Sequence, residues 1–239
     1  MEINIAHLYP DLLNLYGDRG NIITLKRRCE LRGITANIHA YELADGIDFA
    51  NTDIIFIGGG SDREQKLVCD RLCEFKDEIK SYANDGGSLL AVCGGYQLLG
   101  RYYKMGDEAI EGIGLLDIYT EQGRQRLIGN IVLESEFAGG TVVGFENHGG
   151  RTFIGDHKPL GKVLCGKGNN DGGGYEGVVY KNVVATYLHG PLLPKNPLLA
   201  DKILANTLLK KYGKAELSPL DDRAENAAHE YVIKRFLSK

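Results

Sequence analysis

The sequence has 239 residues, of which 43% are hydrophobic and 25% charged, and a formal net charge of −4. It is long enough to bury one sizeable core, and it has no block of like charges that would indicate a nucleic-acid or acidic-membrane partner. The N-terminal stretch MEINIAHLYPDLL lacks the features of a signal peptide, and no window approaches the roughly 18 to 20 apolar residues of a membrane span. We therefore expect a cytoplasmic protein whose five cysteines are free thiols.

Strands and helices alternate through the first half of the chain. Strands are predicted at 3–9, 36–43, 53–60 and 88–93, and helices at 21–33 and 61–87. Short apolar strands that alternate with helices predict a parallel sheet covered on both faces. In such sheets the ligand lies beyond the carboxyl ends of the strands, so the glycine-rich strand ends at 58–60 and 93–95 predict one shared site.

The pattern changes from about residue 110. Short apolar stretches separated by glycines predict antiparallel hairpins as far as about residue 170. The segment 174–190 holds two more strands joined at Lys181-Asn182, and helices are predicted at 196–213 and 221–239. With no repeat and no linker, the chain is predicted to be one α/β domain over residues 1–239, with a β-rich insertion at roughly 110–170.

The stretch SLLAVCGGYQLLG, residues 88–100, places a cysteine where an apolar strand must turn sharply. Ala91 and Gly95 lie two residues on either side of Cys93, which is the layout of a nucleophile elbow with a strained backbone. A helix that begins at Gly94 would favour the thiolate and would direct the Gly94 amide toward a developing oxyanion. Taken alone, these residues fit a buried structural cysteine equally well.

A nucleophilic cysteine requires a base, and the sequence offers six histidines. Those at 7, 39 and 229 fall within predicted strands or helices, and the one at 157 falls in a polar loop, so we expect none of them to be catalytic. His148 in GFENHGGRT and His189 in ATYLHGPL both lie where a strand meets a glycine-containing turn. Local context does not separate these two.

Together these parts resemble a class I glutamine amidotransferase. Cys93, Gly95 and Gln97 match the family signature C-x-G-x-Q, between IGGG at 57–60 and the later His189. The stretches AVCGGYQLLG, GIGLLD, GFENHGGRT and YLHGPLLPKNP are similar to the cobyric-acid-synthase-like branch, which includes the glutaminase subunit of lipid II isoglutaminyl synthase. No GxxxxGK[ST] loop occurs, which disfavours the fused cobyric acid synthase. The resemblance covers essentially the whole chain and implies a flavodoxin-like parallel sheet flanked by helices, with a β-rich antiparallel insertion.

The resemblance also implies roles for particular residues. Cys93 would attack the side-chain amide of L-glutamine, and His189 would protonate the departing ammonia and then activate water. The remaining assignments are oxyanion-hole amides at Gly59, Gly60 and Gly94, a pocket-shaping side chain at Gln97, and an arginine for the α-carboxylate at Arg126. The neighbouring Arg124 is the alternative for that arginine, because either guanidinium could bind a carboxylate bidentately.

One departure from the family pattern concerns the residue that should orient the histidine. Many class I amidotransferases carry H-x-E, whereas here His189 is followed by Gly190 and Pro191. The missing carboxylate could come from Glu146, from another acid of this chain, or from a partner subunit. We favour the partner, because an incomplete site would prevent idle hydrolysis of glutamine.

The resemblance implies a heterodimer with a Mur-ligase-like, MurT-like subunit that uses ATP to amidate the α-carboxyl of D-glutamate in the lipid II stem peptide. The lipid-linked acceptor would be bound through that partner, so no nucleic acid and no membrane insertion are expected for this chain. We expect no cofactor or metal here, with ATP and Mg²⁺ on the partner. Two alternatives are an amidotransferase for another acceptor, such as a corrinoid precursor, and a non-catalytic scaffold of the same fold.

Overall fold

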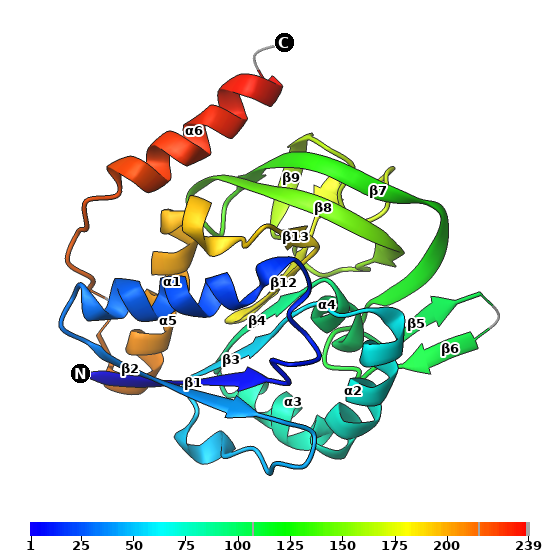
Figure 1. The fold of residues 1–239 in the computed structure, drawn as a ribbon, viewed down its shortest axis with the longest axis horizontal. Helices are drawn as coiled ribbons and strands as arrows, with labels where there is room; N and C mark the ends of the chain where they lie inside the picture. The colour runs from blue at the N-terminus through cyan, green and yellow to red at the C-terminus, as the bar shows by residue number, and fades with distance from the viewer. Residues whose placement is uncertain (107, 215, 238–239) are drawn as a thin grey trace.

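A computed structural model describes residues 1–106, 108–214 and 216–237. The strands form two sheets, one of six strands in the order β11-β12-β4-β3-β1-β2 and one of seven strands (Figure 1). The strands of the first sheet are β1 (Glu2–Leu8), β2 (Thr35–Tyr41), β3 (Ile54–Ile57), β4 (Ser88–Val92), β11 (Val178–Tyr180) and β12 (Val183–Thr186). Those of the second are β5 (Tyr102–Met105), β6 (Glu108–Glu111), β7 (Tyr119–Ser135), β8 (Gly140–Phe153), β9 (Gly161–Cys165), β10 (Tyr175–Glu176) and β13 (Leu188–His189).

The first sheet is parallel except at its edge, where β11 pairs antiparallel to β12. Its order, with β12 following β4, is the flavodoxin-like order. Every residue of β3 and β4 is buried, as expected for central strands covered on both faces. The predicted α/β fold with a parallel sheet is confirmed.

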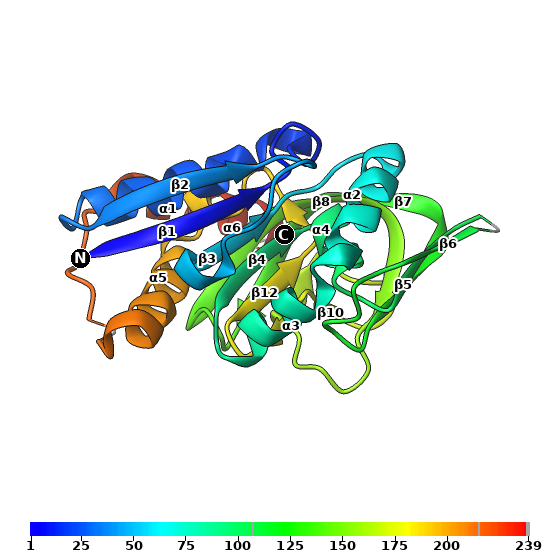
Figure 2. The same cartoon turned by 90° about the horizontal axis from the view of Figure 1, so that it is seen from below.

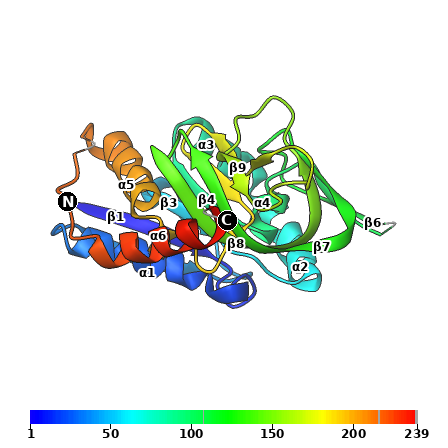
Figure 3. The ribbon, with the colours of Figure 1, turned by 90° about the horizontal axis from the view of Figure 1, so that it is seen from above.

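The helices are α1 (Arg19–Glu30), α2 (Asp62–Glu74), α3 (Lys76–Asn84), α4 (Gly94–Leu98), α5 (Pro197–Tyr212) and α6 (Arg223–Leu237), with short 3₁₀ turns at Leu15–Gly17, Phe49–Asn51 and Leu193–Lys195. The connection from β1 to β2 and the connection from β3 to β4 run in opposite directions along the sheet. Because such crossovers are right-handed, α1 and α3 lie on opposite faces, as Figure 3 shows.

The single helix predicted at 61–87 is wrong, because it is broken at Phe75. That residue has φ −104° and ψ 14°, and it ends α2 and precedes α3. Its ring lies 5.9 Å from that of Phe49, centroid to centroid. The break lets both helices bury an apolar side, α2 through Leu72 and α3 through Ile79. Apolar spacing within each half did not reveal this change of direction.

The second sheet is dominated by one long hairpin, not by the short strands predicted from residue 110 onward. β7 has 17 residues and β8 has 14. The glycines taken as turns lie inside these strands and allow close packing. A Cβ on Gly144 would lie 2.6 Å from Leu188 Cδ2. The pairing of β7 with β8 is irregular between Gln122 and Leu127, and this bulge faces the candidate site.

The two sheets lie beside each other, with the β5–β6 hairpin at the end far from the N-terminus (Figure 2). They are joined where β12 of the first sheet leads through Tyr187 into β13 of the second. One large core runs through both, and a small cluster of Val132, Val143 and Val232 attaches α6 to the hairpin. Across the described residues, no helix is both long and apolar enough to cross a membrane.

Candidate active site

Cys93 lies at the carboxyl end of β4, in a backbone conformation that is rare for a residue with a side chain. Its φ is +52° and its ψ is −103°, which confirms the predicted strained turn. A Cβ on Gly95 would lie 2.7 Å from the carbonyl oxygen of Ile57, so only glycine lets β3 and the turn approach so closely. The helix that follows is shorter than a typical helix, since α4 has five residues. The turn therefore presents the thiol at the edge where the strands end.

His189 meets Cys93 from the second sheet. Its side chain is fully buried on β13, and it is within hydrogen-bonding contact of Cys93. Both residues lie close to Gly59, which follows β3. A Cβ on Gly59 would lie 3.0 Å from Cys93 Cβ and 3.3 Å from His189 Cε1. The structure thus brings together the predicted nucleophile and the predicted base, which are far apart in the sequence, and it selects His189 as the histidine that contacts the thiol.

A carboxylate that the sequence did not single out lies behind His189. Asp18 is fully buried at the start of α1, and its Oδ1 lies 3.5 Å from His189 Nδ1. Its Oδ2 accepts a hydrogen bond of 2.8 Å from the Gly59 amide, which fixes the carboxylate beside the imidazole. The sequence contained one indication of Asp18, namely its position. It lies in the loop after the first strand, and that loop is at the same edge of the sheet as Cys93.

Glu146, the in-chain candidate for this carboxylate, is occupied elsewhere. Its two oxygens accept hydrogen bonds from the amides of Lys167 and Gly168, at 2.8 and 2.9 Å. Glu146 is therefore not the carboxylate beside His189. Asp18, another acid of this chain, occupies that position, and the contribution of a partner subunit stays a prediction. The contact also bears on the predicted oxyanion hole. The Gly59 amide donates to Asp18, which leaves Gly60 and Gly94 as candidates for oxyanion donors.

The neighbouring charges determine the protonation of His189. Burial by itself lowers the pKa of the imidazole, but hydrogen bonding and charge from Asp18 and Cys93 outweigh this effect and raise the pKa of His189 to about 10. The ring is therefore held as an imidazolium beside the sulfur of Cys93 at neutral pH. Such a pair is suited to attack by sulfur followed by donation of a proton to a leaving amine.

A cavity of about 440 Å³ opens onto Cys93. Its lining includes the predicted residues Gly60, Cys93, Gln97, Arg124, Arg126 and His148. Arg126 comes from the hairpin bulge and donates to the side chain and the carbonyl oxygen of Asn147, at 3.0 and 2.9 Å. Both Arg124 and Arg126 border the cavity, so the lining does not show which of them would bind the α-carboxylate of glutamine. The two bonds to Asn147 orient the guanidinium of Arg126.

Gln97 is buried in the wall of this cavity, and its Nε2 donates to the hydroxyl of Tyr187 at 3.1 Å. Gly94 packs against another polar side chain, because a Cβ there would lie 2.6 Å from Gln65 Nε2. Gln65 and Tyr187 were not identified from the sequence. They lie on α2 and between β12 and β13, and only the folded arrangement of these elements places them at the site.

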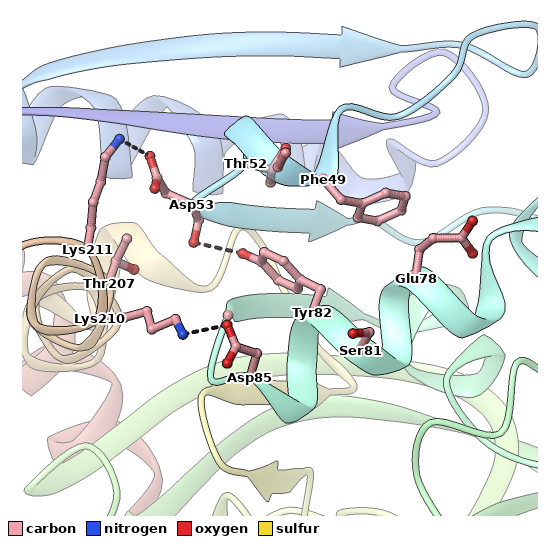
Figure 4. A pocket seen from close by; sticks show the side chains of 12 residues that line it. Phe49, Thr52, Asp53, Glu78, Ser81, Tyr82, Asp85, Thr207, Lys210 and Lys211 are labelled. Atoms are coloured by element: carbon pink, nitrogen blue, oxygen red, sulfur yellow. Dashed lines mark hydrogen bonds and ion pairs between the residues drawn. The ribbon is translucent and has the colours of Figure 1, made fainter.

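A separate cavity of about 490 Å³ lies at the opposite, amino-terminal edge of the sheet (Figure 4). There Lys211 pairs with Asp53 at 2.7 Å and Lys210 pairs with Asp85 at 2.6 Å. Both lysines of this cavity are therefore engaged in ion pairs. Within the described part of the chain, no cluster of three or more histidine, cysteine or acidic residues could hold a metal ion.

Comparison with known proteins points to the same chemistry. Residues 4–197 match the model of the CobB/CobQ-like glutamine amidotransferase domain. The chain is 47% identical over 235 residues to the lipid II isoglutaminyl synthase (glutamine-hydrolyzing) subunit GatD of Staphylococcus aureus, covering 98% of this chain and 96% of that protein. It is 44% identical to the subunit of the same name from Streptococcus pneumoniae, over 96% of this chain and 90% of that protein. Among solved structures, PurLQS from Thermotoga maritima has the same fold, with a TM-score of 0.58, 20% identity, and coverage of 88% of this chain and 99% of that one.

Proposed function

The chain belongs to the CobB/CobQ-like glutamine amidotransferase family, and we propose that it is the glutamine-hydrolysing subunit of a lipid II isoglutaminyl synthase. The observation that carries this proposal is the convergence of a strained Cys93 and a buried His189 at a cavity that Arg126 also borders. A scaffold of the same fold would have no use for this set.

In the first half of the reaction, the Cys93 thiolate attacks the side-chain amide carbon of glutamine. The resulting oxyanion accepts hydrogen bonds from backbone amides, for which Gly60 and Gly94 are the candidates. The imidazolium of His189 gives its proton to the amide nitrogen. The carbon–nitrogen bond breaks, ammonia leaves, and a γ-glutamyl thioester remains on Cys93.

In the second half, water attacks the thioester. His189 is now neutral and accepts a proton from the water, and the carbon–sulfur bond breaks to give glutamate and the Cys93 thiolate. The enzyme returns to the thiolate–imidazolium pair from which it started. The α-carboxylate of glutamine is held throughout by Arg126, whose guanidinium is oriented by Asn147.

The ammonia is used by a partner in this proposal. The partner is an ATP-dependent, Mur-ligase-like subunit that binds ATP and Mg²⁺, activates the α-carboxyl of D-glutamate in the lipid II stem peptide, and receives ammonia from this chain. Two findings support it: the relatives carry the name of a synthase subunit, and this chain has no GxxxxGK[ST] loop of its own.

The test is a reconstitution with amide-¹⁵N-labelled glutamine, the partner, ATP and lipid II. We expect labelled lipid II with the wild type. We expect none with Cys93→Ala, which should still support amidation from free ammonia, because only the supply of ammonia is lost. Cys165→Ala is the matched control and should behave like the wild type. Transfer of label by the Cys93→Ala variant would exclude Cys93 as the nucleophile. In a parallel reaction with a corrinoid precursor in place of lipid II, label on that precursor and none on lipid II would identify the other acceptor.

A further inference from the structure

His148 is held in one tautomer by a single hydrogen bond. Its Nδ1 lies 2.9 Å from the carbonyl oxygen of Gly150. A carbonyl oxygen can only accept, so Nδ1 must carry the hydrogen and Nε2 must carry a lone pair. Burial, assisted by nearby positive charge, lowers the pKa of His148 to about 4, so the ring remains neutral at physiological pH. Nε2 is therefore a fixed hydrogen-bond acceptor.

This acceptor has no protein donor. The side chain of His148 is 2% exposed, and Nε2 has no hydrogen-bond partner among the described residues. A buried polar atom left unpaired costs free energy, and native structures rarely retain one without a reason. The ring cannot simply turn away, because it stacks on Tyr187 with centroids 3.7 Å apart and planes 4° apart. His148 also lines the cavity that contains Cys93.

The bound substrate carries the donors that this site lacks. Glutamine has N–H groups at its α-ammonium and at its side-chain carboxamide, and both must enter a cavity bordered by Arg126 and Cys93. We propose that Nε2 of His148 accepts a hydrogen bond from an N–H group of bound glutamine and so positions the substrate for attack. This inference rests on the proposed glutaminase function and adds to it a substrate-positioning residue distinct from the base.

Two variants separate this role from a structural one. In His148→Asn the side-chain amide nitrogen can replace Nδ1 and keep the bond to Gly150, while the Nε2 acceptor is lost. In His148→Gln the side-chain oxygen can reach the position of Nε2. For glutamine hydrolysis by the chain with its partner, we expect KM to rise about 10-fold or more in His148→Asn, with kcat changed less, and His148→Gln to recover most of the loss.

A second measurement identifies the donor. The electrophile 6-diazo-5-oxo-L-norleucine keeps the α-ammonium and the α-carboxylate of glutamine but has no carboxamide N–H. If the α-ammonium donates to His148, His148→Asn will weaken concentration-dependent labelling of Cys93 by this electrophile as well. If the carboxamide donates, labelling will match the wild type while hydrolysis remains impaired.

An unchanged KM in His148→Asn, or equal impairment of the two variants, would overturn the inference. A different result would contradict the proposed function itself, namely a wild-type protein that is not labelled at Cys93 and does not hydrolyse glutamine. Melting temperatures of both variants show whether each is folded when it is assayed.

Discussion

At the scale of single residues, the main feature of the site is that the base is oriented from within the chain. Asp18 is fully buried and reaches His189 at 3.5 Å, which is the separation of an ion pair and longer than a short hydrogen bond. The charge of Asp18 nevertheless helps to raise the pKa of His189 to about 10. In the proposed mechanism Asp18 does not touch the reacting atoms, and we expect it to position His189 and to keep it protonated.

Replacing Asp18 by Asn should weaken catalysis and move its pH dependence. Without the carboxylate charge the pKa of His189 falls, so the imidazolium that protonates the leaving amide nitrogen is lost at lower pH. We expect kcat for glutamine hydrolysis to fall about 100-fold, and the alkaline limb of the pH profile to move down by about 1 to 3 units. The measurement is kcat against pH between 6 and 10.5, the range that brackets the raised pKa of about 10.

Asp11→Asn is the matched control, because Asp11 is in the same loop with its side chain 77% exposed. It should leave both the rate and the profile unchanged. A normal rate and an unmoved alkaline limb in Asp18→Asn would show that Asp18 does not act through His189. The carboxylate would then have to come from the partner subunit, as the sequence favoured.

Short motifs made part of the site predictable from sequence. The elbow depends on contacts among neighbours, so Ala91, Cys93 and Gly95 could be interpreted from their spacing alone. Asp18 and Tyr187 could not, because their roles depend on which loops meet in space. Local context also left His148 and His189 equivalent, and only the folded arrangement of the strands shows that His189 lies against the thiol.

At the scale of elements, α1 is held in place by a buried ion-pair cluster. The guanidinium of Arg28 bonds Asp201 on α5 and Asp222 just before α6, each with a shortest distance of 2.6 Å. Its side chain is 5% exposed, so the two carboxylates are the partners that offset the cost of burying its charge. The cluster joins three segments of the chain and anchors α1, the helix whose N-cap residue is Asp18.

Arg28→Met should therefore destabilise the whole fold. Removing the cation leaves Asp222 unpaired in a partly buried position, and Asp201 keeps only Arg32. We expect a loss of about 3 kcal/mol of unfolding free energy, or about 6 to 12 °C in Tm. Arg27→Met on the same helix, where the side chain is 66% exposed, should change stability by less than about 0.5 kcal/mol. Equal shifts in the two variants would show that the cluster contributes little.

At the scale of the whole molecule, the strand order of the first sheet followed from alternating apolar strands and helices. The junction between the sheets did not. Glycines inside β7 and β8 cannot be told from turn glycines in the sequence, because they differ only in what packs against them.

Glu176 is a second residue whose role could not be predicted from the sequence. It lies on β10 of the second sheet, yet its Oε1 accepts from the amide of Tyr187 at 2.6 Å and its Oε2 accepts from Thr186 Oγ1 at 2.7 Å.

This junction should make stability depend on pH. Burial, partly offset by these hydrogen bonds, raises the pKa of Glu176 from 4.5 to about 8. Between these values the folded protein binds a proton that the unfolded chain has released, so the contribution of Glu176 to stability falls as pH rises through this window. Glu176→Gln, which cannot ionise, should gain stability relative to the wild type from pH 5 to pH 8.5, by about 1.4 kcal/mol for each pH unit inside the window at most.

Urea unfolding at pH 5, 6.5 and 8.5 measures this difference, with the exposed Glu134→Gln as the control. Parallel pH curves for the wild type and Glu176→Gln would contradict the prediction. A difference that grows with pH would mean that ionisation of Glu176 strains the segment that carries Tyr187 and His189. Ionisation of Glu176, with its pKa of about 8, would then loosen the junction that carries His189 at a lower pH than the pKa of about 10 at which His189 loses its proton.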